Sequence, residues 1–209
     1  MTAEHTHDVG IDATADFLNT LAIDDGGTVE RLTTTDDAIA FLAGRGLAHE
    51  SALRTQAARV GDRAWLERVR LTRRALRALW DAEVEHHRPD AEAIAAVNAV
   101  LRGAPRIEFV VGEDSCGVGH RHTDDDPAGE ALARLVEPFL ASVAAGTTDR
   151  LRICANDDCR WVFEDTSRAG RRRWCDMTSC GNVAKARRYR ARHKEPEGAP
   201  DDRAAAPAD

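Results

Sequence analysis

The most informative segment of the 209-residue sequence is CANDDCRWVFEDTSRAGRRRWCDMTSC, which occupies residues 154–180. It contains two cysteine pairs of equal spacing: Cys154 with Cys159 and, after 15 intervening residues, Cys175 with Cys180. Two close pairs joined by a short loop are typical of a tetrahedral zinc site, because each pair lies on a tight turn that directs both sulfurs inward. The sequence therefore predicts one structural zinc ion held by these four cysteines.

Two other interpretations of the cysteines are disulfides and unrelated core thiols. Residues 1–5 (MTAEH) lack the basic region and apolar segment of a signal peptide. We therefore expect a cytoplasmic protein, in which disulfides are rare. A catalytic zinc ion keeps one position open for water and usually has a histidine or carboxylate ligand. Four thiolates leave no such position, so the predicted ion is structural.

The charge of the chain is unevenly distributed. The whole sequence has a formal charge of −7, which by itself argues against a polyanionic partner. Residues 150–194, however, contain 13 basic and five acidic residues, a net charge of +8, and the remainder carries −15. Such asymmetry favours contact with nucleic acid, although a solvated basic surface is the other interpretation.

The pattern around the cysteines predicts a small finger over residues 150–194. We expect a strand at 160–164, a turn at 166–170 and a return at 171–174. Residues 181–192 have no helix breaker and are rich in Ala and Arg, so they predict a helix, with Tyr189 packed inward. These parts together indicate a treble-clef-like zinc finger with four cysteine ligands. The residues predicted to contact nucleic acid are Arg168, Arg171, Arg172, Arg173, Lys185, Arg187, Arg188, Arg190 and Arg192.

The segments 154–168, 171–182 and 184–188 resemble the CGNR zinc finger over about 40 residues. The tetrad that names this family ends in Arg, whereas this chain has Cys180, Gly181, Asn182 and Val183. In that family the finger usually follows an ABATE-type domain, and residues 16–20 (DFLNT) and 32–37 (LTTTDD) resemble the opening motifs of that domain. The resemblance implies a bacterial-type DNA-binding transcription regulator of the stress response.

Residues 1–149 are predicted to be mainly helical. Periodic apolar residues indicate helices at 11–23, from Thr34 or Thr35, at 62–84, from about residue 90 and from residue 127, where Pro138 should kink or divide the helix. Alternation at 106–111 predicts one strand of a small β-hairpin, with 118–123 as its partner. The long helix at 62–84 has a basic face that we expect to be solvated or paired with acids. The fold class is therefore α+β: a mainly helical domain (1–149), the finger (150–194) and a disordered tail (195–209).

Asn19 stands out because it adjoins Phe17 and Leu18 on an apolar helix. A buried Asn side chain needs hydrogen-bond partners. Asn19 therefore either makes structural hydrogen bonds or contributes to a ligand pocket.

The function that these features favour is DNA-binding transcription regulation, with an acidic helical domain that senses a small-molecule effector or forms a homodimer. The alternatives are an RNA- or protein-binding zinc module, and a small-molecule-binding protein or enzyme with its pocket in residues 1–149. We find no catalytic constellation and expect no enzyme activity. No apolar run approaches the ~18 residues of a membrane span, so we expect no membrane partner.

Overall fold

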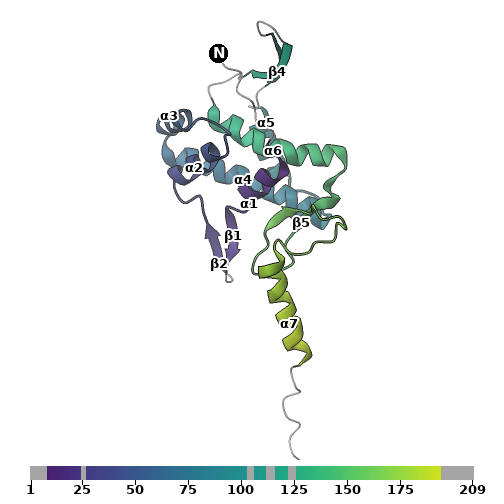
Figure 1. Ribbon diagram of the computed structural model, residues 1–209. Helices are drawn as coiled ribbons and strands as arrows, with labels where there is room; N and C mark the ends of the chain where they lie inside the picture. The colour runs from purple at the N-terminus through teal and green to yellow at the C-terminus, as the bar shows by residue number, and fades with distance from the viewer. Residues whose placement is uncertain (1–8, 25–26, 103–105, 112–115, 122–125, 194–209) are drawn as a thin grey trace, which may run out of the picture. The chain divides into compact units, whose positions relative to one another are not determined.

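The computed structural model describes residues 9–24, 27–102, 106–111, 116–121 and 126–193 (Figure 1). The chain forms two compact units, the first ending at Cys175 and the second beginning at Asp176. The described residues are mainly helical, with small antiparallel two-stranded hairpins, which confirms the predicted fold class. The predicted tail, 195–209, lies outside the described residues.

The first unit combines helices with short two-stranded hairpins. Its helices are α1 (Ile11–Leu18), α2 (Thr35–Gly44), α3 (Glu50–Val60), α4 (Asp62–Glu85), α5 (Ala91–Arg102) and α6 (Pro127–Ala145). Its hairpins are β1 (Leu21–Asp24) with β2 (Gly27–Glu30), β3 (Arg106–Val111) with β4 (Cys116–Arg121), and β5 (Leu151–Ile153) with β6 (Val162–Glu164). The second unit contains a π-helical turn (Met177–Gly181) and α7 (Asn182–Arg192).

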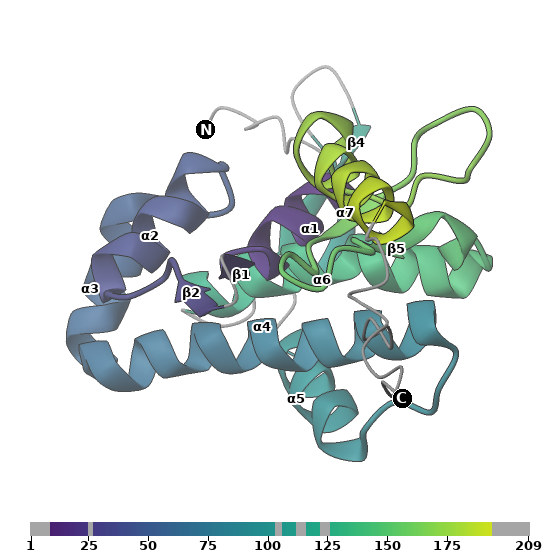
Figure 2. The same ribbon diagram turned by 90° about the horizontal axis from the view of Figure 1, so that it is seen from below.

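Helix α4 is the central element of the first unit. Its apolar side chains recur at helical spacing, and those of Trp65, Val69, Leu76 and Trp80 are buried. Figure 2 shows α4 running through the unit, with α2 and α3 near one end and α5 near the other.

The buried side chains of this unit form two clusters. The first contains Phe17, Ile39, Leu53, Trp65 and Leu132, among others. The second contains Leu18, Leu76, Trp80, Phe139 and, from the hairpin of the predicted finger, Leu151 and Val162.

The first helix is shorter than predicted. It ends at Leu18 rather than near residue 23, and the chain continues into the β1–β2 hairpin, which the sequence did not predict. The Thr20 hydroxyl donates to the Phe17 carbonyl at 2.6 Å, and the Thr20 amide bonds the same oxygen at 3.2 Å. A short polar side chain that bonds nearby backbone competes with helical hydrogen bonding, which explains the early end.

Helices α2 and α6 each begin directly after a residue whose side chain caps the helix. Thr34 caps α2 and forms a reciprocal capping box with Asp37, as predicted for Thr34. Asp126 caps α6 by accepting from the Gly129 amide at 2.9 Å. Helix α6 continues through Pro138 to Ala145, so it is not divided there. Burial of side chains on both sides of the proline stabilises the helix across the missing hydrogen bond.

The basic face of α4 is paired largely with acids, as expected. Its ion pairs include Arg68–Asp126 (2.7 Å), Arg74–Glu67 (2.5 Å) and Arg77–Asp81 (2.7 Å). Arg73 is only 1% exposed and binds both carboxylate oxygens of Glu30. These arginines therefore contribute to the fold. In the described part of the chain, no helix is both long enough and apolar enough to cross a membrane.

Candidate metal centre

The first cysteine pair lies between the strands of the β5–β6 hairpin. β5 and β6 are antiparallel, with Leu151 opposite Glu164 and Ile153 opposite Val162. The strand predicted at 160–164 is thus present as β6, but its partner is β5 and not the predicted return at 171–174. The hairpin buries Leu151 (2% exposed) and Val162 (1%) in the second core cluster, whereas residues 171–174 contain three arginines and offer no comparable apolar face.

Backbone hydrogen bonds close the turn that contains Cys154 and Cys159. The Cys154 amide donates to the Trp161 carbonyl at 2.7 Å. The amides of Cys159 and Arg160 both donate to the Asn156 carbonyl, at 2.9 and 3.0 Å. Arg160 has a left-handed backbone (φ 54°), which turns the chain back toward β6. We call residues 154–161 the first knuckle.

Cys175 is held close to the first knuckle by its neighbours. The Ala155 amide donates to the Arg173 carbonyl at 2.8 Å. The Arg172 guanidinium donates to the carbonyls of Trp174 (2.9 Å) and Cys175, and it lies 4.7 Å from the centroid of the Phe163 ring. Cys180 lies in the π-helical turn, which Asp176 caps by accepting from the Ser179 amide at 2.7 Å.

The loop between the knuckle and Cys175 is organised by a buried carboxylate. Asp165 is 1% exposed and accepts from the Ser167 hydroxyl (2.5 Å), the Ser167 amide (3.0 Å) and the Arg172 amide (2.8 Å). These hydrogen bonds, led by that of the Ser167 hydroxyl, lower the pKa of Asp165 to about 2. Arg150 and Arg152 donate to loop carbonyls at Ser167 and Gly170. The loop is thus fixed by its own polar groups together with two arginines that precede the first knuckle.

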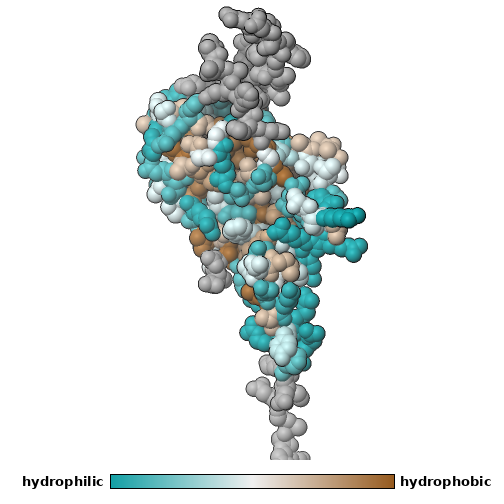
Figure 3. Space-filling model, viewed as in Figure 1, coloured by the Kyte–Doolittle hydropathy of each residue, from teal (hydrophilic) through white to brown (hydrophobic). Residues whose placement is uncertain are grey.

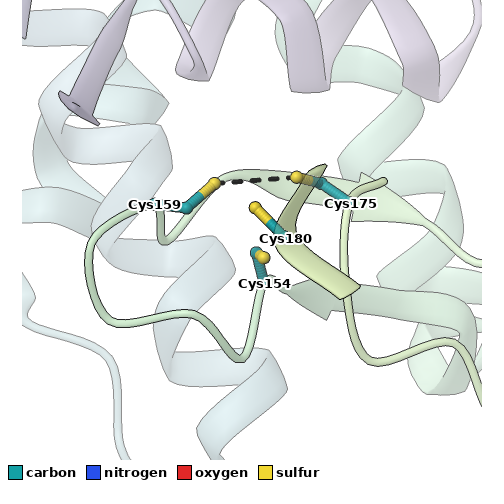
Figure 4. A group of neighbouring side chains, drawn as sticks. All are labelled: Cys154, Cys159, Cys175 and Cys180. Atoms are coloured by element: carbon teal, nitrogen blue, oxygen red, sulfur yellow. Dashed lines mark hydrogen bonds between the residues drawn. The ribbon is translucent and has the colours of Figure 1, made fainter. Parts of the chain in front are cut away.

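The structure brings the four predicted cysteines together. Their sulfur atoms all lie within 4.8 Å of one another, and their side chains point toward a common centre (Figure 4). None of the four forms a disulfide. A tetrahedral site with Zn–S bonds of about 2.3 Å requires sulfurs about 3.8 Å apart. The sulfurs of Cys159 and Cys175 are 3.6 Å apart, so the donor set and its spacing fit zinc.

The electrostatics of the cluster also favour a dication. Burial, together with the neighbouring thiols of Cys159 and Cys154, raises the pKa of Cys175. Several thiolates held close together in a partly buried site repel one another, and a bound dication offsets that repulsion. Four cysteines in this arrangement therefore indicate a zinc-binding site.

Asn19 lies beside this site. It is 7% exposed, its amide nitrogen donates to the Val162 carbonyl at 2.9 Å, and its amide oxygen accepts from the Val162 amide at 2.9 Å. These are structural hydrogen bonds, one of the two alternatives for this residue. A ligand contact by Asn19 stays a prediction.

Sequence reasoning missed the residues that connect the first knuckle to α4. Arg77 donates to the Arg160 carbonyl at 2.8 Å, and the Arg160 guanidinium pairs with Glu85 at 2.7 Å. The Trp80 indole donates to the Arg152 carbonyl at 3.3 Å. These partners are 72 to 83 residues apart in the sequence, so no local sequence pattern predicts their contacts.

The residues predicted to contact nucleic acid lie in two places. Arg168, Arg171 and Arg173 are exposed in the first unit, whereas Arg172 is half-buried and bonded as described above. In the second unit, the five basic residues Lys185, Arg187, Arg188, Arg190 and Arg192 are all exposed on α7.

No residue of α7 is buried, and on the face shown in Figure 3 this helix is largely hydrophilic. Tyr189 is 58% exposed and stacks on His193 with ring centroids 4.0 Å apart. The expectation that Tyr189 packs inward is therefore wrong, because α7 has no buried face. Val183 is 41% exposed.

Comparison with protein-family models gives two matches in N-to-C order. The ABATE model, described as "Putative stress-induced transcription regulator", matches residues 12–152. The model described as "CGNR zinc finger" matches residues 150–193. No curated protein matches the chain. Since the first match covers more than half of the sequence, the chain belongs to the ABATE family, with a CGNR zinc finger after its ABATE region.

Proposed function

We propose that this protein is a zinc-dependent DNA-binding transcription regulator of the cytoplasm, active in the stress response. One structural zinc ion is held by Cys154, Cys159, Cys175 and Cys180. The family descriptions and the four-cysteine cluster support a zinc-binding regulator. The main observation in support of DNA binding is that helix α7 is cationic and exposed.

The charge and exposure of helix α7 suit it to bind a polyanionic partner. It has five basic residues and no acidic one over 11 residues, and none of them is buried. An isolated helix shorter than about 12–15 residues is only marginally stable in water, and α7 has no apolar face whose packing would stabilise it. A phosphate backbone neutralises its charges and stabilises its structure together.

The arginines of residues 168–173 contribute unequally in this proposal. Arg168, Arg171 and Arg173 are exposed and can bind phosphates. The Arg172 guanidinium is engaged by two carbonyls and the Phe163 ring, so we assign it mainly to holding the loop. Phosphate contacts of this kind position a protein on DNA, and base contacts specify the sequence.

The acidic helical region is proposed to sense a small-molecule effector or to form a homodimer. A cavity of about 600 Å³ between α2, α3 and α4 is a candidate effector site. Its lining combines charged side chains, including Asp36, Arg54 and Arg63, with Ile39 and Leu66. A ligand with both polar and apolar parts fits such a lining.

Binding of labelled duplex DNA at several salt concentrations, followed by fluorescence anisotropy, tests the proposal. The affinity should fall steeply as the salt concentration rises. Arg190→Glu should weaken binding, and the plot of log affinity against log salt concentration should become shallower by about one to two units of slope. Arg88→Glu is the control, because it makes the same charge change at an exposed site of the first unit that does not line the candidate effector cavity.

Two outcomes contradict DNA binding through α7. One is an equal loss of affinity in both variants, which indicates a nonspecific effect of net charge. The other is stronger competition by single-stranded or duplex RNA than by DNA, which favours the RNA-binding alternative.

A further inference from the structure

The strands that flank the first knuckle are part of the helical core. Leu151 on β5 and Val162 on β6 are 2% and 1% exposed, and they lie in one buried cluster with Leu18, Trp80 and Phe139. The strands on both sides of the first knuckle therefore each bury one residue against the helices. Helices α1, α4 and α6 supply the surfaces that cover them.

Polar groups of the helices also hold this hairpin. Both polar atoms of the Asn19 amide bond the Val162 backbone at 2.9 Å, and the Trp80 indole bonds the Arg152 carbonyl at 3.3 Å. Val162 and Asn19 are both buried, so these groups have little access to water. Because an unpaired buried amide is strongly disfavoured, the hydrogen bonds fix where β6 lies on α1.

A third set of contacts acts on the knuckle itself, at the residue after Cys159. Arg160 adopts a left-handed conformation that is sterically unfavourable for a residue with a side chain. Helix α4 holds it there from two sides: Arg77 donates to the Arg160 carbonyl at 2.8 Å, and Glu85 pairs with the Arg160 guanidinium at 2.7 Å. The direction of the chain leaving Cys159 is thereby set by α4.

We propose that the helical body is part of the metal site: Asn19, Arg77 and Glu85 are positioning residues for the ligands Cys154 and Cys159, and zinc binding is coupled to the packing of the second core cluster. This inference is independent of DNA binding. It describes a metal site whose outer partners lie in the ABATE region rather than in the finger.

The coupling must act in both directions. Residues that orient metal ligands typically change metal affinity by about 10–100-fold when they are replaced. By thermodynamic linkage, zinc that binds the folded knuckle stabilises the core to which the knuckle is packed. By the same linkage, a molecule whose binding to this core is strengthened by zinc should strengthen zinc binding by the same factor.

Matched substitutions on α4 test the positioning roles in the full chain. Glu85 and Glu67 are both exposed glutamates of α4 that pair with an arginine, but Glu85 reaches the knuckle and Glu67 pairs within α4. Likewise, Arg77 bonds the Arg160 carbonyl, whereas Arg74 pairs with Glu67 on its own helix. The comparison is thus Glu85→Gln against Glu67→Gln, and Arg77→Met against Arg74→Met.

The zinc affinity of each variant is measured by competition with a chelator. We expect about a two- to fivefold loss in Glu85→Gln, since exposed ion pairs contribute little, and about a tenfold loss in Arg77→Met. Glu67→Gln and Arg74→Met should stay within about twofold of wild type. Equal zinc affinities within each pair overturn the proposal.

Amide hydrogen exchange before and after zinc removal tests the coupling. We expect exchange to increase at the end of α1, in the second half of α4 and around Val136 in α6, which contribute to the second cluster. The amides of α2 and α3, which contribute to the first cluster, should change little. An increase confined to residues 154–181 shows that the metal site and the helical core are independent, and the proposal then fails.

Discussion

The first knuckle and helix α7 belong to the same family match, residues 150–193, yet their surroundings are opposite. Around the knuckle, the flanking strands bury Leu151 and Val162, and the basic residue Arg160 is bonded through both its carbonyl and its guanidinium. Along α7, no residue is buried. The comparison shows that a charge count treats unlike arginines as equal: Arg160 and Arg172 maintain structure, whereas Arg190 is exposed on α7.

The largest expected effect comes from removing a buried ligand on the knuckle side. Cys154 is fully buried, and Cys154→Ser should abolish stoichiometric zinc binding. A loss of about 3 kcal/mol or more would lower the Tm by roughly 6–12 °C for a chain of this size. Zinc content by elemental analysis and thermal unfolding check this. Cys116→Ser, at the one cysteine of the sequence that is not among the four predicted ligands, is the control; an undiminished zinc content in Cys154→Ser contradicts the prediction.

The next effect concerns the amide that joins α1 to β6. Asn19→Ala leaves the amide and carbonyl of Val162 without their side-chain partners, and we expect a loss of about 2–4 kcal/mol in the free energy of unfolding. Urea denaturation measures it. Asn98→Ala, at an exposed asparagine on α5, should change stability by less than about 0.5 kcal/mol. Similar values for the two variants would remove the contrast between the buried and exposed regions.

Acid should affect the helical body through Asp126. Burial opposes ionisation of this carboxyl, but hydrogen bonds from Arg68, the Gly129 amide and Gln56 outweigh it and lower the pKa to about 2. Because the folded-state pKa is depressed, the stabilisation is complete above the unfolded value near 3.8 and is lost as the pH falls toward about 2. We expect Asp126→Asn to cost about 2 kcal/mol at pH 7.

The difference between wild type and Asp126→Asn should shrink as the pH falls below 3.8. Urea unfolding at several pH values measures this difference, and loss of zinc in acid affects both proteins and largely cancels. A difference that is the same at pH 7 and near pH 2 contradicts the assignment. Helix α7 contains no acidic residue, so its own charge is insensitive to this titration.

The smallest effect is expected at Val183, where the CGNR pattern has Arg. Val183 is 41% exposed in the first turn of α7, so Val183→Arg should change stability by less than about 0.5 kcal/mol. It should steepen the salt dependence of DNA binding by about one and raise affinity a few-fold. Anisotropy titrations with labelled duplex DNA measure both quantities. Unchanged binding would mean that this position on α7 does not face the phosphate backbone.

Local patterns in the sequence predicted much of this structure. The spacing of the four cysteines, the start of α2 at Thr34 or Thr35 and the apolar stripe of α4 each depend on residues close in the chain. The β1–β2 hairpin was missed because α1 ends where the Thr20 hydroxyl and amide both bond the Phe17 carbonyl, which the apolar periodicity does not reveal.

The surroundings of the metal centre could not be predicted in this way. The pairing of Asn19 with Val162 spans 143 residues, and the contact of Arg77 with Arg160 spans 83. Such contacts depend on how helices pack in three dimensions, which periodicity alone does not give. An asparagine among apolar residues indicated that Asn19 would need hydrogen-bond partners, but it did not indicate which backbone groups would be those partners.

The distance along the chain between Asn19 and Val162 has a consequence during protein synthesis. At about 5–20 residues per second, a ribosome needs roughly 7–30 s to add the 143 residues that separate them. Until then, Leu18 and Trp80 lack part of their packing, although most of the helices have already been made. The helical body is therefore completed only after both ligands of the first knuckle have been translated. A nascent fragment that stops before Val162 exposes an unfinished core, and we expect cellular proteases to remove it.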